Sequence, residues 1–212
     1  MSENFALTIA RQYGSGGRTV GEKAAKLLGY KFVDRELITL AAQKSGYHAD
    51  VIHSADEKAT NSLLYTLAMG SSVFGAPHTG YSLDVPINDK LFIIQSDIIK
   101  SLVKDEPCVF VGRCADYVLA EHKNKVSIFL YADMDERIAR ICERHDVDEA
   151  EAKNLITKTD KRRMNYYNFY TGKKWGKFDN YDLSINTGRL GLDGTAEMIA
   201  DFVRKAIENG AK

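Results

Sequence analysis

Short apolar runs alternate along this chain with stretches of helical periodicity. The apolar run from Phe5 to Ala10 predicts a buried strand, which passes through a glycine-rich segment into a helix from Thr19 to Leu28. A second short strand is predicted from Tyr30 to Val33, with Asp34 placed to cap a helix from Arg35 to about Lys44. This strand-helix-strand-helix opening favours a parallel sheet.

The alternation continues toward the C-terminus. Apolar runs predict strands at 107–112, 126–131 and 183–186, and helical periodicity appears at 91–103, 115–122, 134–144, 149–167 and 193–208. Between these parts the signal weakens, with a helical segment at 55–67 and a Gly-, Ser- and Pro-rich loop at 69–86. We therefore predict a single α/β domain with a parallel sheet between layers of helices.

The composition narrows the classes of function. Lys plus Arg and Asp plus Glu both number 29, so the chain has no overall positive charge with which to hold a polyanion. Cys108, Cys114 and Cys142 fit neither a disulfide framework nor a zinc site, and no histidine has metal-ligand spacing. The N-terminus lacks a basic signal region, and no apolar run reaches the ~18 residues of a membrane span. We expect a cytoplasmic protein with reduced thiols.

The first loop has the composition of a phosphate-binding loop, Gly14-Ser15-Gly16-Gly17-Arg18-Thr19. In the standard motif G-x-x-x-x-G-K-[ST], backbone N–H groups surround phosphate, the Lys reaches the β and γ oxygens, and the hydroxyl binds magnesium. Aligned to end at Thr19, the chain has Gln12 at the first Gly and Arg18 at the Lys. The preceding strand and following helix favour an anion site, although a simple Gly-rich turn is the alternative.

Two later segments resemble the cytidylate kinases. Val109 to Arg113 ends in a Gly-Arg pair, and Val126 to Arg140 places a strand before an Arg-bearing helix, in the family's order and spacing. With the first loop and Asp160 to Arg163, the resemblance covers most of the chain and is closest to the cytidylate kinase-like branch. It implies a three-layer α/β/α P-loop NTPase fold and a nucleoside monophosphate kinase. Such an enzyme uses ATP with Mg²⁺ and phosphorylates a CMP-like or related small acceptor.

The resemblance also implies roles for individual residues. Arg113 would bind the acceptor phosphate, while the family's next residue, an Asp that reads the base, is Cys114 here, which leaves the acceptor's base open. Arg140 and Arg163 would contact phosphate, and Asp160 would contact ribose. The first Arg-Asp pair of the family's lid signature is missing. The resemblance thus predicts a binding site with an altered acceptor pocket.

Further positions complete the expected site and leave some choices open. Arg18 would replace the loop Lys, and Thr19 would hold the magnesium that arrives with ATP. Asp34 either begins the monophosphate-binding segment or only caps a helix. Arg137 is as well explained by a structural salt bridge, and Arg162 by a solvated helix face. We expect an acceptor-binding insertion at about 49–103 and a mobile lid at about 146–181.

Two other classes of function remain open. A nucleotide-binding regulatory module without turnover would explain the missing loop Lys, the missing lid pair and Cys114. A nucleic-acid-binding protein would explain the mixture of aromatic and basic residues from Tyr166 to Trp175. The zero net charge opposes the second class, and aromatics on a long helix more often lie in a core. We therefore expect a nucleotide donor and a small acceptor as partners, with neither nucleic acid nor membrane.

Overall fold

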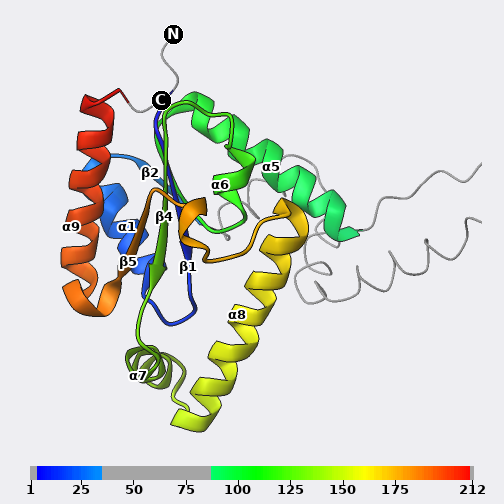
Figure 1. The fold of residues 1–212 in the computed structure, drawn as a ribbon, viewed down its shortest axis with the longest axis vertical. Coiled ribbons are helices and arrows are strands. Elements are labelled where there is room, and N and C mark those ends of the chain that lie inside the picture. The colour runs from blue at the N-terminus through cyan, green and yellow to red at the C-terminus, as the bar shows by residue number, and fades with distance from the viewer. Residues whose placement is uncertain (1–3, 35–86, 211–212) are drawn as a thin grey trace, which may run out of the picture.

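The computed structural model describes residues 4–34 and 87–210 (Figure 1). The predicted helix from Arg35, the helical segment at 55–67 and the loop at 69–86 lie outside these residues. Most of the expected acceptor-binding insertion at 49–103 lies outside them too. The remainder of the chain contains the sheet, its covering helices and the whole of the expected lid.

A parallel sheet forms the centre of the described part. Its five strands lie in the order β2-β3-β1-β4-β5, and every neighbouring pair is parallel. Their bounds are β1 Ala6–Arg11, β2 Lys31–Val33, β3 Cys108–Val111, β4 Lys125–Tyr131 and β5 Leu183–Asn186. The five strands predicted from apolar runs are confirmed, with ends that differ by at most one residue. The expected three-layer α/β/α fold is likewise confirmed.

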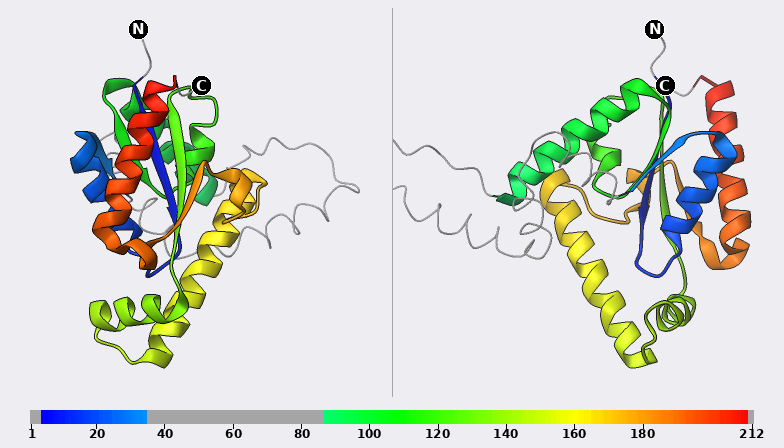
Figure 2. Two further views of the ribbon diagram at one scale, coloured as in Figure 1. Left: turned by 60° about the vertical axis from the view of Figure 1, so that its left-hand side comes forward. Right: turned by 180° about the vertical axis from the view of Figure 1, so that it is seen from behind.

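Alternation along the strands divides the core between the two faces of the sheet. Leu7 and Ile9 of β1 pack with α1 (Gly17–Leu28) and α9 (Thr187–Glu208) on one face. Ala6 of the same strand packs on the other face with α5 (Ile87–Asp105) and α6 (Ala115–Val118). Figures 1 and 2 show these helix pairs on opposite sides of the sheet. Burial on both faces explains why the strands are nearly continuous apolar runs.

Two helices extend beyond the carboxyl ends of the strands. They are α7 (Met134–His145) and α8 (Glu149–Thr171), followed by the short helix η1 (Phe178–Asn180). The Asp148 carboxylate accepts a hydrogen bond from Glu151 N at 2.8 Å and caps the start of α8. In both views of Figure 2, α8 begins beside α7 and returns toward α5. None of the helices in the described ranges is long and apolar enough to cross a bilayer.

Five helices differ from the sequence prediction by more than one residue at an end: α5 spans 87–105 rather than 91–103, α8 ends at 171 rather than 167, and three others differ where they join the sheet. The helix predicted at 115–122 stops at Val118, because Lys125 Nζ donates to Asp116 O at 2.9 Å and Ala120 N turns to Tyr117 O instead. The last helix begins at Thr187 rather than 193, but its φ/ψ breaks at Gly191. The first helix begins at Gly17, two residues earlier than predicted.

Candidate active site

Asp34 and Arg113, which were expected in the site, lie at the carboxyl edge of the sheet together with Arg11 and Thr187, which the sequence did not indicate. Arg11 ends β1, Asp34 follows β2, Arg113 follows β3, and Thr187 follows β5. Ligands of open α/β sheets bind at this edge, where the strand order reverses on either side of a central strand. Here β1 is that central strand, and the glycine-rich loop begins directly at its end.

The loop from Gln12 to Gly16 is held in a tight turn. Gly14 and Gly16 have φ values of 80° and 76°, in the left-handed region that favours glycine. Gly16 is the N-cap of α1. The buried Ser15 hydroxyl donates to Gln12 O at 2.9 Å. The turn therefore delivers the chain to the start of α1, where the first N–H groups have no partner within the helix.

Side chains from three helices hold the outer side of this loop. Four of its carbonyl oxygens, including the one that ends β1, accept hydrogen bonds from guanidinium or hydroxyl groups. The pairs are Arg163 Nη1 to Arg11 O (2.9 Å), Arg137 Nε to Tyr13 O (2.7 Å), Arg140 Nη1 to Gly14 O (3.2 Å) and Thr187 Oγ1 to Ser15 O (2.8 Å). A trans peptide points its N–H opposite its C=O. The N–H groups of Gly14 and Gly16 therefore point away from these side chains.

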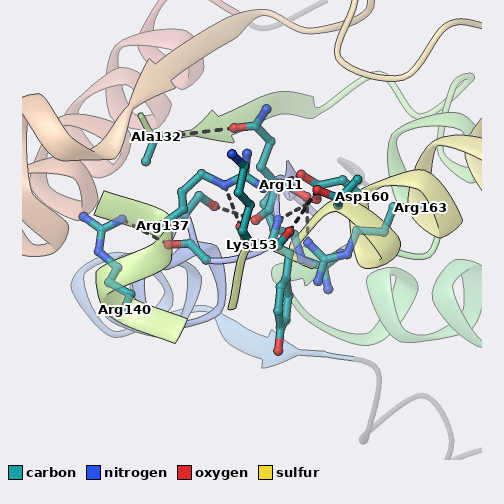
Figure 3. Close-up of polar contacts among 12 residues, drawn as sticks. Arg11, Ala132, Arg137, Arg140, Lys153, Asp160 and Arg163 are labelled. Carbon is teal, nitrogen blue, oxygen red and sulfur yellow. Dashed lines mark hydrogen bonds and ion pairs between the residues drawn. The ribbon is translucent and has the colours of Figure 1, made fainter. Parts of the chain in front are cut away.

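Asp160 ties α8 to both the loop and α7. One carboxylate oxygen accepts from Tyr13 N at 2.8 Å, and the other forms an ion pair with Arg137 Nη2. Arg137 is only 4% exposed, and its Nε also bonds the loop, so both charges of the pair are satisfied in a buried place. Figure 3 shows Arg137, Asp160 and Arg163 converging from two helices on the loop. The loop and the expected lid are thus one hydrogen-bonded unit.

Arg163 is half-buried against the loop. Its guanidinium carbon lies 5.4 Å from the centre of the Tyr13 ring, within the range of a cation–π contact. Burial lowers the pKa of Arg163 to about 10, although the neighbouring Asp160 opposes this shift. The side chain therefore remains a cation at neutral pH, at the junction of the loop and α8.

Arg18, which was expected to replace the loop lysine, is paired with a residue that follows β2. Its Nε donates to Asp34 Oδ2 at 2.8 Å, and the carboxylate is buried while half of the Arg18 side chain is exposed. The structure therefore brings together two expected site residues as an ion pair. Thr19 is exposed on the same first turn of α1.

The segment after β3 has an unusual backbone. Gly112, Arg113 and Cys114 have φ values of 84°, 58° and 54°, three successive left-handed residues. For the two residues with a side chain this conformation costs about 1–2 kcal/mol each. Such strain is concentrated at binding sites, where the surrounding structure maintains it. The three left-handed residues turn the chain sharply between β3 and α6, on the side of the sheet where we expect the acceptor to bind.

The neighbours of Arg113 are buried and neutral. Burial raises the pKa of the Cys114 thiol well above its usual range. Burial also raises the pKa of Tyr166 to about 12, against the opposing effect of Arg113, which also hydrogen-bonds to it. Arg113 thus links the segment after β3 to α8.

Asp116 does not take over the role of the missing base-reading Asp. Its Oδ2 accepts a hydrogen bond from Tyr167 OH at 2.7 Å, in a buried position. Burial raises the pKa of Asp116, and the hydrogen bond from Tyr167 and the charge of Lys125 oppose this shift. The carboxyl is engaged in joining α6 to α8.

Part of the aromatic and basic segment packs inward, although Phe169 is 48% exposed and Lys173 and Lys174 are exposed. The rings of Phe92 on α5 and Tyr170 on α8 stack at 4.2 Å with an interplanar angle of 9°, and Tyr170 OH donates to Asp89 at 2.9 Å. Trp175 meets Phe129 of β4 edge to face at 5.5 Å. These rings therefore join helices to each other and to the sheet, which removes the main argument for base stacking on this segment.

Sequence reasoning missed several contacts of the loop. No role was predicted for Tyr13 in the glycine-rich segment, for Arg11 just after the predicted strand that ends at Ala10, or for Thr187 just after the predicted strand at 183–186. Arg137 was left as a structural salt-bridge partner, which describes its contact with Asp160 but not its bond to Tyr13 O. The signal available in the sequence was position, since Arg11 and Thr187 directly follow or end strands at the binding edge.

The chain is similar to a known protein family and to several curated proteins. Residues 6–189 match the model of the cytidylate kinase-like family. A curated cytidylate kinase from Saccharolobus islandicus is 21% identical over 204 residues, covering 96% of this chain and 93% of the relative. One from Halobacterium salinarum is 30% identical over 95 residues, which is 45% of this chain and 49% of that protein.

Solved structures show the same fold. An uncharacterized protein from Eubacterium ventriosum is 27% identical, with a TM-score of 0.70, and the match covers 95% of this chain and 99% of that one. Shikimate kinase from Bacteroides thetaiotaomicron is 11% identical, with a TM-score of 0.51 and coverage of 94% and 98%. At that identity the second likeness concerns the fold alone.

Proposed function

Because this chain belongs to the cytidylate kinase-like family, we propose that it transfers the γ-phosphoryl group of ATP to a CMP-like nucleoside monophosphate or a related small acceptor. In this reaction the bond between the γ-phosphorus and its bridging oxygen breaks. A bond from an acceptor oxygen to that phosphorus forms, and ADP leaves with the bridging electron pair. Positioning and charge neutralisation supply most of the catalysis in such transfers.

The observation that carries this proposal is the orientation of the loop. Its carbonyl groups are bonded to Arg163, Arg137, Arg140 and Thr187, and the N–H groups of Gly14 and Gly16 point opposite to the bonded carbonyls of Tyr13 and Ser15 in the same peptides. A helix N-terminus with converging N–H groups attracts phosphate through hydrogen bonds and the helix dipole. We assign the donor phosphates to this place, formed by Gly14 to Thr19.

Magnesium fits the same turn. Mg²⁺ prefers oxygen ligands and keeps several waters when it binds with a nucleotide. The exposed Thr19 on the first turn of α1 offers a hydroxyl next to the assigned phosphates. When bound with ATP, the ion would neutralise charge on the phosphate oxygens.

The acceptor belongs beside β2 and β3. Arg113 is the assigned ligand of its phosphate, held at a strained turn directly after β3, and Asp34 lies after the adjacent strand. The family resemblance places Arg140 and Arg163 at the transferring group, but here both donate to carbonyls on the side of the loop away from its glycine N–H groups, so we assign them to holding the loop. Asp160, which the resemblance assigned to ribose, here bonds Tyr13 N and Arg137, and we assign it to positioning the loop. The neutral Cys114 favours an acceptor other than one read by a carboxylate.

A panel assay tests the proposal. Purified protein is incubated with ATP, Mg²⁺ and each nucleoside monophosphate in turn, then with small alcohols, and ADP formation is followed. We expect one acceptor to accelerate ADP formation well above the rate with water alone. ADP formation that no acceptor accelerates would contradict the transferase assignment.

A second candidate function has an observation of its own. Arg18, the residue aligned with the loop Lys, forms an ion pair with Asp34. A protein that binds ATP without consuming it would be consistent with this arrangement. Calorimetry that detects ATP binding, combined with no turnover across the panel, would favour this regulatory function.

A further inference from the structure

The lysine that supplies the cation in the standard loop is missing here. The alignment of the chain with the motif therefore decides which residue could supply that cation. The last glycine of G-x-x-x-x-G-K-[ST] directly precedes the Lys. Gly16 has the left-handed backbone and caps α1, whereas Gly17 is already the first helical residue. Taking Gly16 as the last glycine puts Gly17 at the Lys and Arg11 at the first Gly, one residue earlier than the alignment ending at Thr19. The Ser/Thr position then falls on Arg18, so Thr19, the proposed magnesium ligand, lies one residue beyond the motif.

In this register the chain exchanges the two ends of the motif. The standard loop has a small first residue and a long cation at the helix start, whereas this chain has a long cation first and a glycine at the helix start. The exchange is spatial as well as sequential. A Cβ placed on Gly17 would lie 2.7 Å from Arg11 Cβ and 2.8 Å from Arg11 Cγ. The Arg11 side chain therefore passes directly over the place where a lysine side chain would begin.

The far end of Arg11 lies between the two assigned phosphate sites. A Cβ placed on Gly112 would overlap Arg11 Nη1 and lie 2.9 Å from Arg11 Cζ. Gly112 directly precedes Arg113, the assigned ligand of the acceptor phosphate. The methylenes of Arg11 thus lie on the start of α1, and its guanidinium lies at the end of β3. Figure 3 shows Arg11 in the middle of the same group of polar residues as Asp160 and Arg163.

We propose that Arg11 is the catalytic cation of the phosphate loop, and that Gly17 and Gly112 are glycines because the Arg11 side chain fills the space of their Cβ atoms. The inference rests on the proposed phosphoryl transfer. It moves the role of the loop lysine from Arg18, whose Nε is bonded to Asp34, to Arg11. A guanidinium keeps its charge at all relevant pH values and can hold two phosphate oxygens at once. At the end of β3 it can contact the group in transit between donor and acceptor.

Three variants test the assignment by binding, without depending on turnover. Arg11→Met keeps most of the methylenes and removes the charge. Arg11→Gly combined with Gly17→Lys rebuilds the standard motif, and Arg11→Gly alone is its reference. The probes are Mg·ATP and inorganic tripolyphosphate, measured by calorimetry, with folding followed by thermal melting. Arg204→Met, on an exposed part of α9, is the control for loss of an arginine.

We expect Arg11→Met to weaken binding of both probes by about 10- to 100-fold, the scale of one charge-assisted hydrogen bond. Arg204→Met should bind like the wild type. The double variant should bind more tightly than Arg11→Gly by about 10-fold or more, since the lysine then occupies vacated space. If the double variant does not fold, Arg11→Met alone decides.

The outcomes separate this inference from the proposed function. Wild-type affinity in Arg11→Met would overturn the assignment of Arg11 and leave phosphoryl transfer standing. A double variant that folds and binds no better than Arg11→Gly would overturn the register. Loss of binding in Arg11→Met, in a protein whose wild type transfers no phosphoryl group, would support the cation site and refute the transferase. A wild type that binds neither probe would overturn both.

Discussion

The ion pair between Arg137 and Asp160 should be a main support of the phosphate loop, and Arg137→Met tests it. The side chains of the pair are 5% and 18% exposed, so the methionine leaves a largely buried carboxylate without its cation. It also removes the donor to Tyr13 O. Breaking a buried pair typically costs about 3–5 kcal/mol, and the partial exposure of Asp160 places the expected loss near ~3 kcal/mol.

The loss can be measured as a melting temperature. For a chain of this length each kcal/mol lowers Tm by roughly 2–4 °C, so Arg137→Met should melt roughly 6–12 °C below the wild type. Arg144→Met is the matched control, because Arg144 lies on the same helix and is exposed. It should change stability by no more than about 0.5 kcal/mol.

A double-mutant cycle with Asp160→Asn isolates the pair itself. The two substitutions should be strongly non-additive, with a coupling of at least ~1 kcal/mol, because each removes the partner of the other. If Arg137→Met melts within experimental error of Arg144→Met, or if the two substitutions are additive, the pair does not support the loop.

Three further predictions concern the loop, the lid and a buried acid. Gly17→Val should abolish ATP binding measured by calorimetry, because its Cβ would lie 2.7 Å from Arg11 Cβ. The control Gly194→Ala should leave ATP binding unchanged, because its Cβ would meet only Leu190, at 3.6 Å. Unchanged ATP affinity in a folded Gly17→Val protein would rule out this site. Hydrogen exchange over 160–181 should slow when ATP and the true acceptor are both bound, and exchange that stays constant counts against a lid. Burial raises the pKa of Asp116, so between the unfolded and the folded pKa the folded state keeps a proton that the unfolded state has lost. The contribution of this group to wild-type stability therefore falls as the pH rises from about 4 to the folded pKa. The Tm of Asp116→Asn minus that of the wild type should therefore rise between pH 4 and pH 7, and a flat or falling difference would show that the buried carboxyl does not titrate this way.

The sheet could be predicted from the sequence because its signal is local. A strand buried on both faces is a short apolar run, and the glycines of the loop follow the first such run directly. The end of α6 could not be predicted this way, since it depends on the Lys125 side chain reaching back to Asp116 O. Helical periodicity continues past this point, and the competing hydrogen bond is invisible to it.

The candidate site was predictable as a set of residues but not as a set of contacts. Arg18, Asp34, Arg140, Asp160 and Arg163 all lie near the loop, as the family pattern implied. Their partners depend on long-range geometry: Arg163 reaches the carbonyl of a residue 152 positions away, and Arg140 one 126 positions away. The position of Arg11 is of the same kind, because it becomes visible only when Gly17 and Gly112 are seen beneath its side chain.

Transfer of labelled phosphate tests the central claim most directly. Wild-type protein is given ATP labelled at the γ-phosphorus together with the acceptor that the panel identifies, and the products are separated. The account predicts that the label appears in the phosphorylated acceptor in amounts equal to the ADP formed. Label that stays in ATP, or that appears only as inorganic phosphate, would contradict it.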